Sequence, residues 1–296
     1  TLNIVYVDAT QGWIPLNDDD VADVPVAPPT QKAIFAYGET GSRASMSNLV
    51  NSSGVVATDV TGVGTARSYL GAASYGLDKA IFGYGDSGTH TNLSNLVNNS
   101  GVVATDTTGV GTARSQLAAA RYGTDKAIFG YGTTGSVSSL TNLVSNSGVI
   151  ATDTSGVGSA RRGLAAAGYG VGLAIFGYGI ISGNSSLTNL VSNVGVVAAD
   201  VSGVGSARRL LAAAGYGTDK AIFGYGFTSS GTAVTNLVSN TGVVASDVSG
   251  VGTARYALAA AGYGLDKAIF AYGIVEAYVS VSNLVNNSGV IASNVT

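Results

Sequence analysis

Short apolar segments, separated by polar turns rich in glycine, make up most of this 296-residue chain. One of them, residues 79–85 (K-A-I-F-G-Y-G), recurs with small changes every 47 residues, and its copies begin at residues 32, 79, 126, 173, 220 and 267. Six equal steps without an insertion indicate one supersecondary unit copied in tandem. The chain is therefore expected to divide into residues 1–31 and a six-unit array in residues 32–296.

Each unit contains four strand-like segments. Around the third copy these are residues 117–123, 126–131, 142–144 and 148–152, and glycine-rich turns separate them. Short strands with a turn about every 8 to 12 residues indicate antiparallel sheet. Four-stranded units of about 40 to 50 residues in tandem are typical of β-propellers. We therefore predict an all-β fold, a six-bladed β-propeller with four-stranded antiparallel blades.

The alternation of side chains along a strand assigns Phe82 and Tyr84 to one face of the sheet and Ile81 and Gly83 to the other. One face of each blade would then be bulky and the other hollow, so the rings of one blade could pack against the glycines and alanines of its neighbour. Each buried Phe or Tyr contributes about 2 to 3 kcal/mol. The L-A-A-A segment suits the innermost strand, where blades converge and large side chains would collide.

The order of segments within a unit resembles the kelch repeat. An arginine precedes a strand of small residues, an apolar strand ending in a glycine pair, a variable loop, an N-L-V strand and a polar turn. The resemblance covers residues 31–296 and implies propeller architecture. Two features depart from kelch repeats: the glycine doublet is G-Y-G or A-Y-G, and Trp13 is the only tryptophan, so the one expected late in each unit is absent. These departures weaken the inference of a family function more than that of the architecture.

Five units carry an aspartate that is followed eight residues later by an arginine. We predict that the two side chains form a structural pair that braces the turn, against the alternative of a ring of ligand-binding arginines. The sixth unit has Asn294 at the aspartate position and no following arginine, which favours pairing because an unpaired carboxylate in a partly buried site is unfavourable. The predicted pairs are Asp59 with Arg67, Asp106 with Arg114, Asp153 with Arg161, Asp200 with Arg208, and Asp247 with Arg255.

One blade lacks a strand, because five copies of the arginine and its alanine-rich segment accompany six copies of the other segments. Residues 2–7 (L-N-I-V-Y-V) have the β-branched and aromatic content of a strand and could complete that blade. The alternatives are residues beyond Thr296 or a strand donated by another subunit, so homo-oligomerisation stays open.

The N-terminal segment differs from the array. It contains all four prolines, and an acidic run begins at Asp18, so residues 16–30 are interpreted as an extended, stiff linker. The opening L-N-I-V-Y-V-D-A-T-Q-G-W-I resembles segments of structural and tail-fibre proteins of marine bacteriophages. This resemblance implies a virion component whose N-terminal segment attaches to other proteins of the particle.

Groups suited to catalysis or metal binding are scarce. With His90 as the only histidine and no cysteine, neither a Cys/His nucleophile pair nor a multi-histidine metal site can be built. The recurring aspartates occupy turn positions, as scaffold residues do. Asp18, Asp19, Asp20 and Asp23 could bind Ca²⁺, but they lack EF-hand spacing and are interpreted as a solvated linker. We predict no catalytic residue, no metal site, no cofactor and no enzymatic activity.

Charge and hydropathy narrow the partners further. A net charge of -3 and a pI near 5.0 argue against nucleic acid, because phosphate binding needs clustered Lys and Arg. No apolar run of about 18 residues is present, so membrane insertion is not expected.

The nine residues after each Y-G pair differ from unit to unit, although the framework is nearly identical. Equivalent loops of a propeller emerge on one side, so this variation would gather on one surface, where recognition usually lies. The alternative is that these loops are unconstrained turns. The candidate ligand-binding residues are Arg43, His90, Asn92, Asn184, Phe227, Glu276 and Tyr278.

We therefore expect a non-enzymatic structural or binding protein of a bacteriophage appendage, such as a tail fibre or spike, located on the virion. Its propeller face would contact host-surface glycans, because the Tyr, Asn and Ser residues of the loops suit contacts with sugars. One alternative is a secreted or cell-surface propeller of the lectin or adhesin kind, or a surface-filament subunit. Another is a decoration protein that binds nothing outside its own particle.

Overall fold

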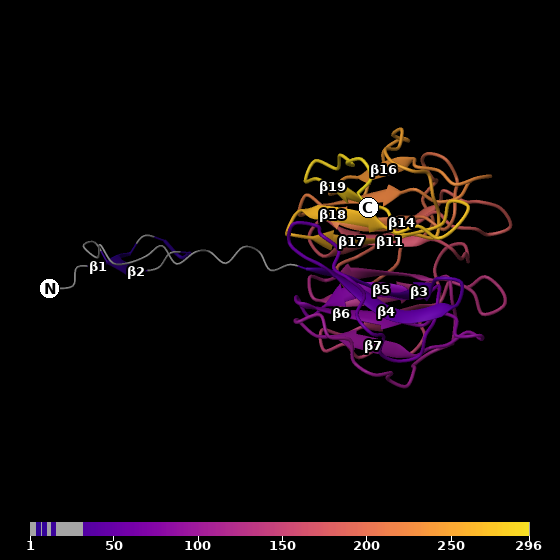
Figure 1. Cartoon of the computed structure of the whole chain (residues 1–296), viewed down its shortest axis with the longest axis horizontal. Helices are drawn as coiled ribbons and strands as arrows, with labels where there is room; N and C mark the ends of the chain where they lie inside the picture. The colour runs from indigo at the N-terminus through magenta and orange to yellow at the C-terminus, as the bar shows by residue number, and fades with distance from the viewer. Residues whose placement is uncertain (1–3, 7, 11–12, 16–31, 296) are drawn as a thin grey trace. The chain divides into compact units, whose positions relative to one another are not determined.

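The computed structural model describes residues 4–6, 8–10, 13–15 and 32–295. Every named element in these residues is a β-strand, so the predicted all-β class is confirmed. The chain divides into two compact units, Thr1–Thr30 and Gln31–Thr296. Figure 1 labels strands of both units.

In the first unit, β1 (Ile4–Tyr6) and β2 (Trp13–Pro15) form an antiparallel pair. Residues 4–6 thus have a strand partner within the first unit. The hypothesis that residues 2–7 complete a blade stays a prediction. A partner seven residues away in the chain requires a much shorter loop to close than a strand of the array would. The predicted linker and its acidic run lie outside the described residues.

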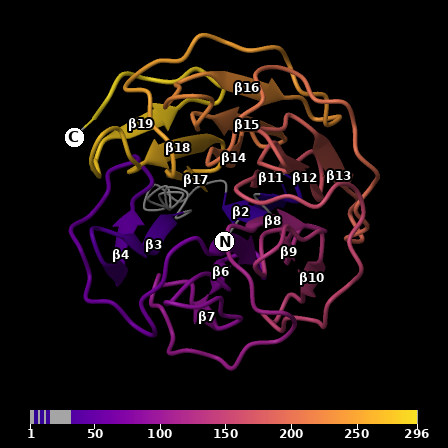
Figure 2. The same cartoon turned by 90° about the vertical axis from the view of Figure 1, so that its right-hand side faces the viewer.

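The second unit is a six-bladed β-propeller, as predicted (Figure 2). Within the described residues, blade 1 has two strands, and blades 2 to 6 have three each. The strands in blade order are β3 (Ala33–Glu39) and β4 (Arg43–Val50); β5 (Gly71–Tyr75), β6 (Lys79–Gly83) and β7 (Ser94–Val97); β8 (Ala118–Tyr122), β9 (Lys126–Gly130) and β10 (Thr141–Val144); β11 (Ala165–Tyr169), β12 (Leu173–Gly177) and β13 (Thr188–Val191); β14 (Ala212–Tyr216), β15 (Lys220–Gly224) and β16 (Thr235–Val238); β17 (Ala259–Tyr263), β18 (Lys267–Ala271) and β19 (Ser282–Val285).

The alanine-rich strand is innermost, which confirms its predicted place. Figure 2 shows β8, β9 and β10 following one another outward from the centre, and β14, β15 and β16 doing the same. Inner strands of neighbouring blades contact each other around the axis. Alanine and glycine allow this close approach because they project little beyond the backbone.

The fourth segment of each unit is not a continuous strand, so the prediction of four-stranded blades is wrong. In blade 3, Val144 bridges Ile150 and Thr141 bridges Thr154. The two bridges are three residues apart along β10 but four residues apart along the outer segment. One extra residue in one of two paired strands is the mark of a β-bulge. The side chain of Asn142 fills this gap, donating through Nδ2 to a backbone carbonyl of the outer segment at 3.0 Å. Each complete blade is three-stranded with an interrupted outer segment.

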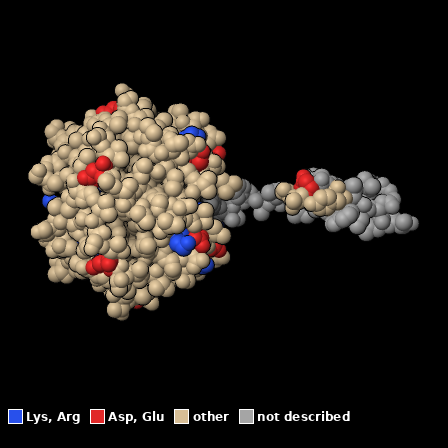
Figure 3. All heavy atoms as spheres, turned by 180° about the vertical axis from the view of Figure 1, so that it is seen from behind, with Lys and Arg blue, Asp and Glu red and all other residues tan. Residues whose placement is uncertain are grey.

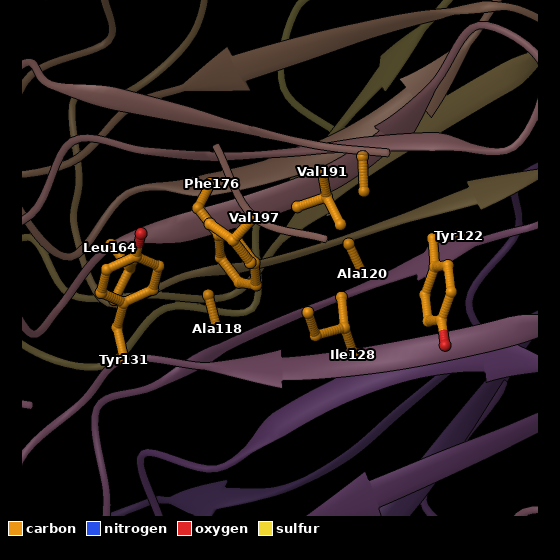
Figure 4. Packing of buried hydrophobic residues seen from close by; sticks show 10 residues of the cluster. Ala118, Ala120, Tyr122, Ile128, Tyr131, Leu164, Phe176, Val191 and Val197 are labelled. Atoms are coloured by element: carbon orange, nitrogen blue, oxygen red, sulfur yellow. The ribbon is translucent and has the colours of Figure 1, made fainter. Parts of the chain in front are cut away.

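Neighbouring blades pack aromatic rings against glycines, as predicted. Phe176 of blade 4 lies over Gly130 of blade 3, and a Cβ on that glycine would come within 2.7 Å of the ring. Figure 4 shows Phe176 in the same layer as Tyr131 and Ala118. The Tyr131 and Phe176 rings meet edge to face, with centroids 5.1 Å apart. The same contact joins most other blades.

The prediction that the Phe and Tyr of one unit share a face is wrong. Phe129 packs toward blade 2, whereas Tyr131 packs toward blade 4. Tyr131 follows the last residue of β9 and has a φ of 65°. In this left-handed conformation the alternation of an extended strand no longer applies. Each blade therefore contributes its Phe to one neighbour and its Tyr to the other.

Backbone hydrogen bonds also join the blades close to the axis. One series links the residues that precede the inner strands, with N to O distances of 2.7–2.8 Å. Each residue donates its N–H to the carbonyl of the residue 47 positions earlier. The series runs through Tyr69, Gln116, Gly163, Leu210 and Ala257. It fixes one end of the propeller independently of which side chains these positions carry.

Candidate binding site on the loop face

A buried arginine braces five of the seams between blades. Arg114 is fully buried, and its Nε donates to the carbonyl of Tyr131 at 2.9 Å while Nη2 donates to Oδ1 of Asn142 at 2.5 Å. Its guanidinium lies 4.4 Å from the ring centroid of Tyr84 in the preceding blade. Burial raises the pKa of Tyr84 to about 12, although the charge of Arg114 opposes this. The guanidinium is thus held inside the fold by stacking and hydrogen bonds.

The acidic partner of each arginine is not the predicted one. Nη1 of Arg114 lies 3.7 Å from Oδ1 of Asp153, and Arg67 faces Asp106 in the same way. The predicted pairs combined residues eight positions apart, and these belong to two different blades because the chain crosses a seam between them. The observed partner lies 39 residues after the arginine, at the far end of the same blade. The observed ion pairs are Arg67 with Asp106, Arg114 with Asp153, and Arg161 with Asp200.

The variable loops lie beside the residues that follow these arginines. In blade 3, Ser115 and Thr133 exchange two backbone hydrogen bonds of 3.0 and 2.8 Å. Equivalent pairs occur in blades 2, 4, 5 and 6. We call this end of the propeller the loop face; it comprises the nine-residue loops and the two residues after each arginine. Those two residues also differ between units: Ser68-Tyr69, Ser115-Gln116, Arg162-Gly163, Arg209-Leu210 and Tyr256-Ala257.

A hollow of about 590 Å³ opens on the loop face over blades 2, 3 and 4. Its lining includes Tyr69, Asp86, His90, Gln116 and Arg162. Tyr69 is 43% exposed, so its ring is accessible. Nη1 of Arg162 donates to Oε1 of Gln116 at 3.0 Å, and no carboxylate among the described residues pairs with this arginine. The hollow thus combines one aromatic ring with several polar groups.

Of the predicted ligand-binding residues, His90 lines the hollow and Arg43 reaches one of its walls. Asp86 accepts a 2.6 Å hydrogen bond from Nη2 of Arg43 in the neighbouring blade. The N–H of Gly88, and then Arg43, lower the pKa of Asp86 although burial opposes them. Nδ1 of His90 is 3.9 Å from Asp86 and is buried without a hydrogen-bond partner among the described residues.

Other predicted residues hold the loops themselves. Asn92 donates to the carbonyl of Gly111 at 2.8 Å, and Asn184 donates to that of Thr228 in the next blade at 2.8 Å. The ring of Phe227 lies beneath the guanidinium of Arg209 at 4.6 Å. These contacts occupy the groups that were expected to meet a ligand.

Glu276 and Tyr278 are exposed on the loop of blade 6, outside the residues that line the hollow. The structure therefore brings only His90 and, through Asp86, Arg43 together at one place. The other five predicted residues are spread over blades 2, 4, 5 and 6.

Sequence reasoning missed Tyr69, Gln116 and Arg162. The signal was present, because the two positions after each arginine vary between units as the loops do. It was overlooked because these positions adjoin the most regular part of the repeat. These positions and the loops lie at the same end of the propeller, and the sequence alone does not show this proximity.

Other classes of site find little support in the described part of the chain. No group of three or more His, Cys, Asp or Glu side chains there could hold a metal ion. No helix in the described ranges is long and apolar enough to cross a membrane. On the side drawn in Figure 3, charged side chains form small separate groups among neutral atoms.

No family model matches the chain, and no curated protein was found to be similar to it. The resemblances to kelch repeats and to phage tail-fibre proteins therefore stay predictions, whereas the propeller architecture rests on the structure.

Proposed function

We propose that this propeller is a non-enzymatic binding module that recognises a saccharide in the hollow of its loop face. The observation that carries the proposal is the coincidence of three features at one end of the molecule. The six units differ most there, the hollow opens there, and its lining combines an accessible tyrosine with hydrogen-bonding groups. Sugars present both apolar ring faces and hydroxyl groups, so an aromatic ring beside polar side chains suits them.

The charge of the lining suggests a narrower class of sugar. Arg162 is bonded only to a neutral amide among the described residues, so its guanidinium has capacity for an anion. A saccharide with a carboxylate or sulfate group would place that group against Arg162 and its rings near Tyr69. The carboxylate of Asp86 is already engaged by Arg43 and repels an anion less than a free carboxylate would.

The biological setting that we propose is a bacteriophage appendage that contacts the host surface. It rests on the resemblance of the N-terminal segment to virion proteins, and on the division of the chain into two compact units, of which the first carries that segment. A secreted or cell-surface lectin-like propeller would use the same face. A decoration protein would leave the hollow without a ligand.

A glycan array probed with the full chain tests the proposal, followed by variants that copy residues from other units. Tyr69→Ala and Gln116→Ala introduce the alanine that blade 6 carries at the equivalent position, Ala257, where the backbone has nearly the same φ. Arg162→Ser introduces the serine that blade 3 carries at the equivalent position, Ser115. Each change is therefore compatible with the fold. We expect each variant to lower affinity at least roughly tenfold, as loss of a stacking or charge-assisted contact does.

Leu210→Ala is the matched control, because it makes the same kind of change at the equivalent position of blade 5, outside the hollow. Its affinity should equal that of the original chain. Absence of any saturable glycan signal would favour the decoration protein. Equal losses in all four variants would place the binding site elsewhere.

A further inference from the structure

The inner edge of blade 1 is unpaired in the described structure. β3 is bonded to β4 on one side, and no third strand from the described residues joins this sheet. In the other five blades the equivalent edge is bonded to the alanine-rich strand. Phe35 of β3 is 6% exposed, whereas Phe129 at the equivalent position is fully buried. An open strand edge offers N–H and C=O groups to another extended segment.

The groups that hold an arginine in every other seam are present beside this edge. Five tyrosines each stack against an arginine guanidinium at 4.2–4.4 Å. The sixth, Tyr272, has no such cation among the described residues and remains partly exposed. Its ring still contacts Phe35 edge to face at 5.5 Å, so the seam between blades 6 and 1 is closed in the same way as the others.

A carboxylate and an amide complete this arginine site. Asp59 accepts a hydrogen bond from Nδ2 of Asn48 at 2.8 Å, as Asp153 does from Asn142. In blades 2 to 4 this aspartate faces the arginine, and in blades 2 to 5 the amide oxygen accepts from Nη2. In blade 1 no cation pairs with Asp59 within the described ranges.

The backbone series near the axis stops at the same place. It ends at the carbonyl of Ala257 and at the N–H of Tyr69, for which no backbone partner exists in the described residues. One added residue would connect the two ends. One extended segment could therefore satisfy all of these groups: the open edge of β3, the ring of Tyr272, the carboxylate of Asp59 and the two ends of the backbone series.

We propose that the open edge of β3 binds an extended strand of a partner polypeptide that carries the repeat's own pattern, an arginine followed after two residues by L-A-A-A. The backbone of this strand pairs with β3. Its arginine stacks on Tyr272, pairs with Asp59 and donates to Oδ1 of Asn48.

Two other occupants fit the site less well. Residues 24–28 (V-P-V-A-P) lie 47 residues before β5, but their two prolines lack N–H donors, and Asp20 stands where the arginine is required. A second copy has no such strand to donate, since all five of its arginine and alanine-rich segments already form inner strands in blades 2 to 6.

A labelled synthetic peptide with the sequence of residues 248–264 (V-S-G-V-G-T-A-R-Y-A-L-A-A-A-G-Y-G), added to the full chain, tests the proposal. We expect saturable binding, a higher Tm of the protein, and slower hydrogen exchange of the β3 amides. Asp59→Asn should weaken peptide binding roughly tenfold, as loss of one charge-assisted contact does. A peptide with alanine in place of its arginine should bind equally weakly to both proteins.

Asp106→Asn is the matched control, because it makes the same change beside an arginine that is already in place. It should leave peptide affinity unchanged. Absence of saturable binding, or equal affinity for the two peptides, would overturn the proposal. Self-association that protects the β3 amides without peptide would show that a second copy is the occupant and would also overturn it. The glycan experiment probes the hollow over blades 2, 3 and 4, whereas the peptide experiment probes the inner edge of blade 1, so either can fail while the other succeeds.

Discussion

Single glycines decide how closely two blades approach. Gly130 is the clearest case, since a Cβ there would lie 2.7 Å from the ring of Phe176. We expect Gly130→Ala to lower the free energy of unfolding by about 1–3 kcal/mol, because a methyl group would overfill a close-packed seam. Gly183→Ala is the control, since no atom lies within 4 Å of its added Cβ. Denaturant unfolding compares them, and equal stabilities would contradict this packing.

Asn294 is a second informative residue. It accepts the bond from Asn283 that an aspartate accepts in other blades, but it brings no negative charge to buried Arg255. Nη2 of Arg255 and Oδ1 of Asn283, whose equivalents are bonded to each other in blade 3, both lack a hydrogen-bond partner among the described residues. We expect Asn294→Asp to stabilise the protein by about 1 kcal/mol at neutral pH, because it places a carboxylate beside a buried cation. Asp153→Asn should have the opposite effect.

The pH dependence of that gain follows from the existing carboxylates. Burial alone would raise the pKa of Asp153, but bonds from Thr112 and Asn142 and the charge of Arg114 lower it below 3.8. A carboxylate with a lowered pKa stabilises the folded state above its ordinary pKa, and this contribution is lost as the pH falls through the lowered value. The difference between Asn294→Asp and the original chain should therefore vanish in acid. A gain that stays constant as the pH falls, even once the carboxylates are protonated, would contradict the assignment.

At the scale of elements, an asparagine holds the outer segment of each blade. Asn142 is fully buried, and it joins Arg114, the outer backbone and Asp153. Asn142→Ala should cost about 2–4 kcal/mol, since it leaves several buried polar groups unpaired. Hydrogen exchange should also become faster in residues 150–154 than in β8. Uniform acceleration across blade 3 would argue against a local role.

The position and side-chain direction of a strand could be predicted from the sequence where one physical rule determines them. They could not be predicted where two rules compete. The L-A-A-A strand could be placed innermost from side-chain size alone. The face of Tyr84 could not, because its left-handed φ of 64° interrupts an alternation that the residue pattern appeared to continue. The outer segment was predicted to be a continuous strand because β propensity does not reveal the extra residue that interrupts its pairing.

For the whole molecule, equal spacing in sequence becomes equal spacing around an axis. This is why the loop face could be predicted without knowing any contact. The partner of each arginine could not, because spacing alone does not show where the chain leaves one blade for the next. The hollow was also beyond reach, since it combines two separate stretches of each unit.

The central claim is that the six units close into a ring, and a distance between spin labels tests it most directly. The chain has no cysteine, so cysteine pairs can be introduced at equivalent exposed serines. Ser100 and Ser147 lie in adjacent blades 2 and 3, while Ser53 and Ser288 lie in blades 1 and 6. A closed ring predicts the same label distance for both pairs. A distance between residues 53 and 288 several times larger than that between residues 100 and 147 would show an open array and contradict the account.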